Sequence, residues 1–178
     1  KIARSWSTQL RLMEEFPAYK FAASQAQQYE WLKEDHPQLY GRVKQAALDG
    51  QWLPIGGTWV EMDCNIPSGE SLARQFLVGQ RFYKEEFGRF SRVFWLPDTF
   101  GYSSQLPQIM KQSAIDYFLT QKLSWNQVNK MPNTTFDWQG IDGSTVIVHF
   151  PPADTYNSHA TVPDLIKSEL NNKDKERS

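Results

Sequence analysis

Asp98 is the residue of this chain best placed to do chemistry. It lies on a turn directly after the apolar run 93–96, which has the length and composition of a buried strand. In proteins that alternate strands and helices, ligands and catalytic groups gather where strands end. Trp95, Phe100 and Tyr102 flank the acid and are expected to form an apolar wall that suits a sugar ring. A carboxylate in this position can attack a sugar or bind a metal ion.

The simpler alternative for Asp98 is a structural role. An aspartate after a strand often closes a turn or caps the next helix. Ser103 lies nearer to the helix predicted at about 105–113 and can take the capping role instead. Asp98 is then left free, and we predict that it is functional.

A second candidate segment, residues 56–63, follows another predicted strand at 52–55. Its two glycines and Trp59 indicate a close approach of the backbone to a ligand, and the acids Glu61 and Asp63 lie just beyond. We expect Trp59 and Asp63 to contact the substrate. The alternative is a glycine-rich turn whose acids are simply solvated. The segment is not a phosphate-binding loop, because no Gly-Lys-Ser/Thr follows it.

Lys122 follows a further predicted strand, at 117–120. Its ammonium can donate to a substrate hydroxyl or to the Asp98 carboxylate, although a lone lysine is usually solvated. His149 and His159 do not have metal-ligand spacing with each other or with Cys64. We therefore expect surface or core roles for these two histidines.

The elements that would position these residues alternate between helix and strand. Apolar residues recur at helical spacing, with Ser68 as the cap and Gly88 as the stop of the longest helix. Asp142-Gly143 is typical of a hairpin turn. The predicted helices are 1–15, 27–33, 37–49, 69–87 and 105–113, and the predicted strands are 19–24, 52–55, 93–96, 117–120, 136–138 and 145–150. This order predicts an α/β fold with a mainly parallel sheet, as a fragment of a β/α barrel.

Composition narrows the class of protein. The 178 residues are 40% hydrophobic and 22% charged, as in ordinary soluble globular domains. A net charge of -1 argues against nucleic acid as a partner, and no apolar run approaches the ~20 residues that span a membrane. The single Cys64 excludes an intrachain disulfide and fits a reducing compartment. The 7 tryptophans are many for this length and suit stacking on sugars or packing at an interface.

The two ends indicate a piece of a larger protein. A helical pattern begins at once with no capping residue ahead of it, and residues 171–178 are a polar run with nothing to pack. We expect both ends to be truncated.

Several blocks of the sequence together resemble the catalytic domain of the family-38 α-mannosidases, in particular the cytosolic and fungal vacuolar branch. The resemblance covers essentially all of residues 1–178, with the blocks in the family's order. The blocks are Gly56-Gly57-Thr58-Trp59-Val60-Glu61-Met62-Asp63, Pro67-Ser68-Gly69-Glu70, Arg74-Gln75-Phe76-Leu77, Phe94-Trp95-Leu96-Pro97-Asp98-Thr99-Phe100-Gly101-Tyr102-Ser103 and Thr120-Gln121-Lys122-Leu123-Ser124-Trp125-Asn126. Thr99 and Tyr102 stand where other branches carry Pro and His, which fits this branch.

The resemblance implies a retaining exo-α-mannosidase that removes terminal α-mannose from free oligosaccharides or glycans. It implies a seven-stranded β/α barrel, of which residues 1–178 would be the central portion, and one divalent metal ion, zinc or cobalt. Asp98 matches the catalytic nucleophile, which in the family also binds the metal. Lys122 falls where other branches have an arginine beside the nucleophile, and Tyr156 matches a tyrosine that contacts substrate.

The resemblance also implies that much of the active site lies outside this chain. A His-x-Asp metal pair is expected before Lys1, and the acid/base aspartate and a further metal histidine are expected after Ser178. The chain alone should therefore be inactive, and the full-length protein is expected to be a homo-oligomer in the cytoplasm or the vacuole.

The residues leave two other functions open. A metal-dependent sugar deacetylase on a similar barrel would also use a strand-end aspartate, but only as a metal ligand or base. A non-catalytic carbohydrate-binding domain would use its tryptophans for stacking and would not depend on the charge of Asp98.

Overall fold

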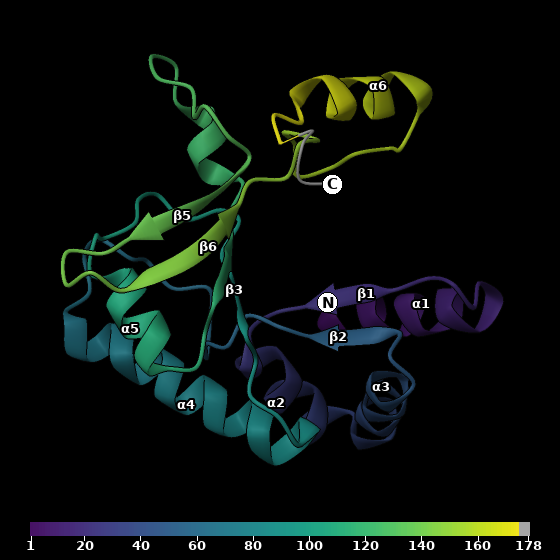
Figure 1. The fold of residues 1–178 in the computed structure, drawn as a ribbon. Coiled ribbons are helices and arrows are strands. Elements are labelled where there is room, and N and C mark those ends of the chain that lie inside the picture. Colours follow the sequence, from purple (N-terminus) through teal and green to yellow (C-terminus); the bar gives the residue numbers. More distant parts are fainter. Residues whose placement is uncertain (175–178) are drawn as a thin grey trace.

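The architecture is that of a computed structural model, which describes residues 1–174. In chain order the elements are α1 (Ile2–Glu15), β1 (Phe21–Ala23), α2 (Ala26–Asp35), α3 (Pro37–Leu48), β2 (Trp52–Pro54), α4 (Gly69–Phe87), β3 (Val93–Trp95), α5 (Leu106–Gln112), β4 (Tyr117–Leu119), the short 3-10 helix η1 (Lys122–Trp125), β5 (Thr135–Gln139), β6 (Thr145–His149) and α6 (Val162–Asn171), as shown in Figure 1. Every predicted helix and strand is present near its expected bounds. Two elements, η1 and α6, are not predicted by the sequence patterns.

The strands form two sheets. β1 and β2 pair in parallel, and the larger sheet has the order β3-β4-β6-β5. In the larger sheet β3, β4 and β6 are parallel, while β5 and β6 form the predicted antiparallel hairpin. The mainly parallel α/β prediction is confirmed.

The predicted barrel is not confirmed by these strands. Within residues 1–174, β5 turns back antiparallel at one edge of the larger sheet, and the short β1 and β2 pair only with each other. A hydrogen bond from Gly56 N to Val93 O, at 3.0 Å, holds the chain after β2 beside β3 without extending a ladder. The described residues therefore form two open sheets rather than a closed ring.

Parallel pairing brings the ends of β3, β4 and β6 to one edge of the larger sheet. Trp95, Leu119 and His149, the last residues of these strands, are matched in register. The loops that leave the three strands therefore start side by side. These loops carry three of the predicted site residues, which lie 24 and 58 positions apart along the chain but at one edge in space.

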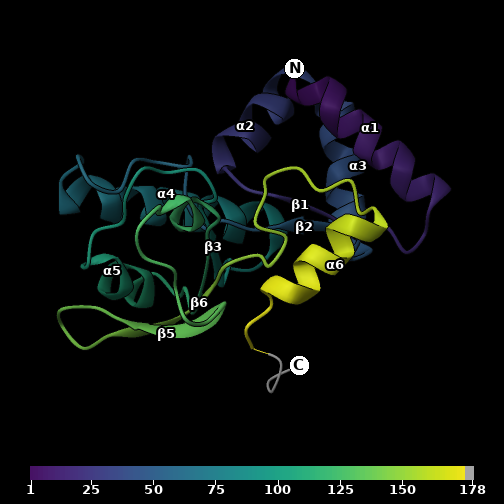
Figure 2. The ribbon, with the colours of Figure 1, turned by 90° about the horizontal axis from the view of Figure 1, so that it is seen from above.

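Two hydrophobic cores hold the elements together, and α4 packs into both of them. The first core lies around Trp6 and Trp52, whose ring centroids are 5.0 Å apart, among α1, α2, α3 and the two-stranded sheet. The second lies around Phe76 and Phe118, between the larger sheet and the helices α4 and α5. Figure 2 shows this division, with α1, α2 and α3 grouped at one end of the molecule. Because α4 supplies Tyr83 to the first core and Phe76 to the second, it ties the two halves together.

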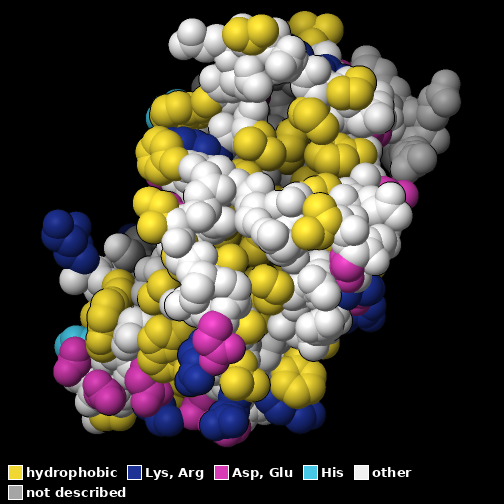
Figure 3. Space-filling model, turned by 90° about the vertical axis from the view of Figure 1, so that its left-hand side faces the viewer, with side chains coloured by type: hydrophobic (Ala, Val, Ile, Leu, Met, Phe, Trp, Pro, Cys, Tyr) yellow, Lys and Arg dark blue, Asp and Glu magenta, His cyan; other side chains and the backbone are white. Residues whose placement is uncertain are grey.

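The surface carries both signs of charge. In Figure 3, Lys, Arg, Asp and Glu side chains gather at the lower end of the face shown, whereas hydrophobic side chains are spread from its top to its bottom. Among residues 1–174, no helix is long and apolar enough to cross a membrane.

Gly79 lets α4 lie directly against the loop that follows β2. A Cβ at this position would fall 2.4 Å from the Thr58 carbonyl carbon and 2.6 Å from Thr58 Cα. Trp59 N also donates to Gln75 O, in α4, at 3.0 Å. The close approach therefore fixes the loop that carries Trp59 and Glu61, because backbone atoms in a packed interior cannot move aside freely.

Gly79→Ala should lower the free energy of unfolding by about 1–3 kcal/mol, since the added methyl group overlaps backbone atoms. Gly41→Ala is the matched control, because Gly41 also lies inside a helix but a methyl group added there would meet no atom within 4 Å. That control should be neutral or slightly stabilising. Urea unfolding measures both variants, and equal midpoints for the two would contradict this account of α4.

Candidate active site

The Asp98 carboxylate is exposed to solvent and accepts hydrogen bonds from two donors. Its side chain is 62% exposed. Lys122 Nζ donates to Asp98 Oδ1 at 2.8 Å, and the Tyr156 hydroxyl donates to the same oxygen at 3.0 Å. Within the described residues, Asp98 Oδ2 has no hydrogen-bond partner. One oxygen of the carboxylate is therefore fixed while the other remains available for chemistry.

Each of these residues reaches the site from the end of a different parallel strand. Asp98 follows β3, Lys122 opens η1 directly after β4, and Tyr156 lies in the loop after β6. The predicted contact between Lys122 and Asp98 is present, and Tyr156, which only the family resemblance indicated, joins it.

The Lys122 ammonium lies between two aromatic rings. Its Nζ atom is 3.9 Å from the ring centroid of Phe100 and 3.9 Å from that of Trp125. The Lys122 side chain is only 9% exposed, so the charge depends on these rings and on Asp98 for the interactions it loses with water.

The two donors keep Asp98 ionised. The hydrogen bond from Lys122 is the largest influence that lowers the pKa of Asp98, and the bond from Tyr156 adds to it. The smaller effect of burial acts in the opposite direction. Burial, followed by the bond to the Asp98 carboxylate, raises the pKa of Tyr156 to about 12, so this phenol remains a donor at neutral pH.

The predicted apolar wall around Asp98 is only partly present. Phe100 lies over the Lys122 ammonium and is 76% exposed. Tyr102 instead turns toward the second core, where its ring lies 5.2 Å from that of Phe118. Its hydroxyl bonds Leu96 O, at 3.1 Å, and the Thr120 hydroxyl. Tyr102 therefore does not line the site. Its ring packs in the second core, and its hydroxyl links the residues that follow β3 and β4.

In the loop after β2, Trp59 and Asp63 make contacts within the fold rather than with Asp98. Trp59 packs edge-on against Phe82 in the first core, and its Nε1 donates to Gln27 Oε1 at 2.8 Å. Asp63 is exposed, and its Oδ1 accepts from the backbone amides of Asn65 and Ile66, both at 2.8 Å. No described contact joins either residue to Asp98, and their contact with substrate stays a prediction.

Glu61 is the residue in this region to which the sequence alone assigns no role. Ser24 Oγ, at the end of β1, donates to Glu61 Oε1 at 2.6 Å. Burial is the largest influence on the pKa of Glu61 and raises it. The hydrogen bond from Ser24 lowers this pKa, and the negative charge of Asp98 raises it further. Glu61 therefore lies within electrostatic reach of Asp98. The sequence signal that could have indicated a role for Glu61 is its position in the same glycine-containing loop as Asp63.

The described residues do not make up a metal site by themselves. In residues 1–174, no group of three or more His, Cys, Asp and Glu side chains could hold an ion. Asp98 offers one carboxylate oxygen. The Nδ1 atom of His149 lies 3.0 Å from the Thr135 hydroxyl in the hairpin.

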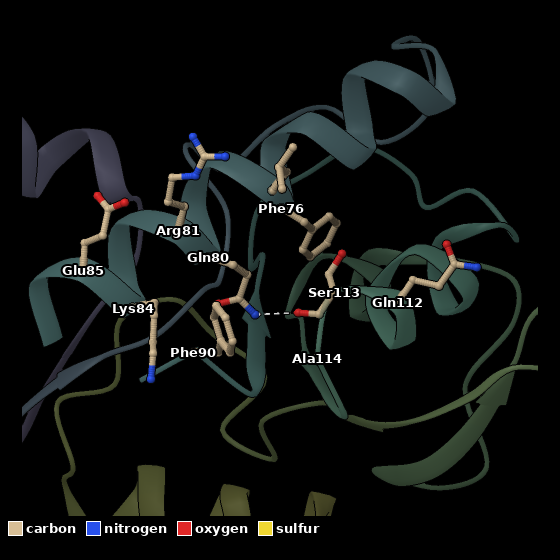
Figure 4. Close-up of a pocket in the computed structure, with 10 residues that line it drawn as sticks. Phe76, Gln80, Arg81, Lys84, Glu85, Phe90, Gln112, Ser113 and Ala114 are labelled. Atoms are coloured by element: carbon tan, nitrogen blue, oxygen red, sulfur yellow. Dashed lines mark hydrogen bonds between the residues drawn. The ribbon is translucent and has the colours of Figure 1, made fainter. Parts of the chain in front are cut away.

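The pocket in Figure 4 lies away from Asp98. It has a volume of about 430 Å³ and opens between α4 and the end of α5, beside Phe76, Phe90 and Ala114. Gln80 Nε2 crosses it to donate to Ser113 O at 2.7 Å. Among the described residues that line this pocket there is no predicted site residue, so it belongs to the packing of α4 on α5.

Comparison with known proteins identifies the family. Residues 1–178 match the family model described as "Glycosyl hydrolases family 38 N-terminal domain". The chain belongs to glycosyl hydrolase family 38. It is 59% identical over 177 residues to alpha-mannosidase G of Dictyostelium discoideum, covering 99% of the chain and 16% of that protein. It is 58% identical over 178 residues to alpha-mannosidase 2C1 of Homo sapiens, covering 100% of the chain and 17% of that protein.

The fold of this family-38 chain also matches a solved structure. An alpha-mannosidase from Enterococcus faecalis V583 superimposes with a TM-score of 0.77 at 19% sequence identity, over 97% of this chain and 20% of that one. At this identity the likeness concerns the fold alone. The sequence matches confirm the family resemblance, and the chain spans about a sixth of the length of these sequence relatives.

Lys122→Met in the full-length protein should move the acidic limb of the kcat/KM profile to higher pH. The pKa of Asp98 is lowered mainly by Lys122, so without the ammonium the carboxylate takes up its proton at a higher pH. Lys130→Met, in the same loop region but bonded to Ser124 O, is the control and should leave the profile unchanged. A profile unaffected by Lys122→Met would make Lys122 a bystander.

Proposed function

We propose that the protein containing this chain is a retaining exo-α-mannosidase, with Asp98 as its nucleophile. The observation that carries this proposal is the asymmetry of the Asp98 carboxylate. Lys122 and Tyr156 engage Oδ1, whereas Oδ2 has no partner among residues 1–174 and the side chain is exposed. The names of the sequence relatives support a mannoside as the substrate.

The proposed chemistry has two steps. In the first, Asp98 Oδ2 attacks the anomeric carbon of a terminal α-mannose while a second carboxylic acid, outside the described site, protonates the departing oxygen. A covalent mannosyl ester forms on Asp98. In the second, the same second group, now a carboxylate, takes a proton from water as the water attacks the anomeric carbon, and Asp98 leaves as a carboxylate.

Lys122 and Tyr156 have a different effect on each step. Their hydrogen bonds stabilise the Asp98 carboxylate, so they keep it ionised before attack but also lower its basicity. In the second step Asp98 is the leaving group, and the same two bonds favour its departure. Fixing Oδ1 also sets the direction in which Oδ2 faces, which is the orientation that an in-line attack requires.

We also propose that Asp98 supplies one ligand to a zinc or cobalt ion whose other ligands would come from other parts of the protein. Each carboxylate oxygen has two lone pairs, so Oδ2 could bind the ion with one of them and keep the other for the attack. Such an ion would polarise the sugar hydroxyls that it binds. The donor chemistry fits, since a carboxylate oxygen suits either metal, but residues 1–174 contribute no complete set of ligands.

The remaining expectations concern the whole protein. We propose that it acts on mannose-containing oligosaccharides, free or on glycans, and that it works as a homo-oligomer in the cytoplasm or the vacuole. The family resemblance puts the acid/base group outside residues 1–178, and we therefore propose that this chain has no activity by itself.

Asp98→Asn in the full-length protein should reduce the rate of α-mannoside hydrolysis by at least about a thousandfold, because the amide is a poor nucleophile. Asp142→Asn is the matched control, since Asp142 is an exposed aspartate whose carboxylate bonds only within the β5–β6 turn. Release of mannose from an aryl α-mannoside measures both. An Asp98→Asn enzyme that keeps more than about a tenth of the wild-type rate would overturn the assignment.

A further inference from the structure

Trp125 is an aromatic residue beside the nucleophile whose contacts serve neither core. It ends η1, the same short helix that Lys122 begins. Its side chain is 61% exposed, and it is absent from the described members of both hydrophobic cores. Burial therefore does not account for where the ring lies, and its described ring contacts are with Lys122 and Tyr156.

The geometry of η1 brings this ring to Lys122. In a 3-10 helix, residues three apart lie directly above one another. Lys122 and Trp125 have this spacing, and the Lys122 ammonium lies 3.9 Å from the centroid of the Trp125 ring. The backbone of this one short turn therefore places the Trp125 ring next to the Lys122 ammonium.

The same ring also contacts the second donor to Asp98. The Trp125 and Tyr156 centroids are 5.8 Å apart, with an angle of 63° between the rings, which is an edge-to-face contact. Tyr156 comes from the loop after β6, which is otherwise far along the chain from η1. Both groups that bond Asp98 Oδ1 therefore meet one indole ring.

We propose that Trp125 is a positioning residue for the Asp98 nucleophile, which it serves by fixing the Lys122 ammonium and the Tyr156 ring at the same time. This inference rests on the proposed glycosidase function. A lysine side chain has four rotatable bonds and a tyrosine in a loop can swing away, so each hydrogen bond to Oδ1 needs something that limits motion. The attraction between the cation and the ring provides that limit for Lys122, and the edge-to-face contact provides it for Tyr156.

The proposal separates an effect on rate from an effect on substrate binding. Trp125 acts on groups that hold the nucleophile, so Trp125→Leu should lower kcat about tenfold while KM changes less than about threefold. Trp125→Phe keeps a ring face over the ammonium and should restore kcat to within about threefold of wild type. Trp125→Gln replaces the ring with a polar side chain and should lower kcat as Trp125→Leu does. Agreement between the two variants excludes a folding defect specific to one of them.

Trp31→Leu is the matched control. Trp31 is half-exposed on α2 and takes no part in the site, so its replacement should leave kcat unchanged. Steady-state kinetics with an aryl α-mannoside and full-length enzyme measure all of these variants.

A double-variant comparison tests whether Trp125 acts through Lys122. If it does, Trp125→Leu should cost no more than about threefold when Lys122 is already Met, because one of the two groups that it positions is gone. A full additional tenfold loss in that background, or an unchanged kcat for both Trp125→Leu and Trp125→Gln, would overturn the proposal. Asp98→Asn in the same series tests the function itself: if that variant stays active, the glycosidase assignment fails whatever Trp125 does.

Discussion

The bond between the Lys122 ammonium and Asp98 Oδ1 is the interaction around which this site is arranged. It joins the ends of β3 and β4, and it places a nearly buried cation next to an exposed carboxylate. Removing a lysine charge from water is costly unless other charges and dipoles replace the water. Here a carboxylate and two aromatic faces do so. The parallel register of the three strands is what makes this meeting possible, because it sets their ends at a common edge.

Much of the fold follows from local sequence signals. Ser68 caps α4 and Gly88 ends it in the left-handed conformation, as their types predicted. The hairpin of the larger sheet follows from its turn residues in the same way. The sequence does carry signals for α6: Thr161 and Asp164 form a capping box, and Val162, Leu165, Ile166 and Leu170 follow at helical spacing, although none of these residues is buried. The barrel was inferred from the order of elements, which does not by itself determine how many strands pair or whether a sheet closes.

The site was predictable in part, for physical reasons that differ from residue to residue. Asp98 and Lys122 follow apolar strands, and strand ends in a parallel sheet converge. Tyr156 lies seven residues beyond β6 in an irregular loop, so its approach to Asp98 depends on a loop path that periodicity does not encode. The roles of Tyr102 and Glu61 could not be predicted because they depend on the direction of the side chains. The Tyr102 ring packs into the core, and the Glu61 carboxylate bonds Ser24. Such directions are set by tertiary packing rather than by position along the chain.

Covalent trapping tests the central claim most directly. The full-length enzyme would be incubated with an activated fluorinated mannoside, which slows breakdown of a glycosyl-enzyme ester, and its peptides analysed by mass spectrometry. We expect one added fluoromannosyl group on the peptide that contains Asp98, with the Asp98→Asn enzyme unlabelled. A label on another carboxylate, or hydrolysis of α-mannosides by an enzyme that never becomes labelled, would contradict the assignment of Asp98 as the nucleophile.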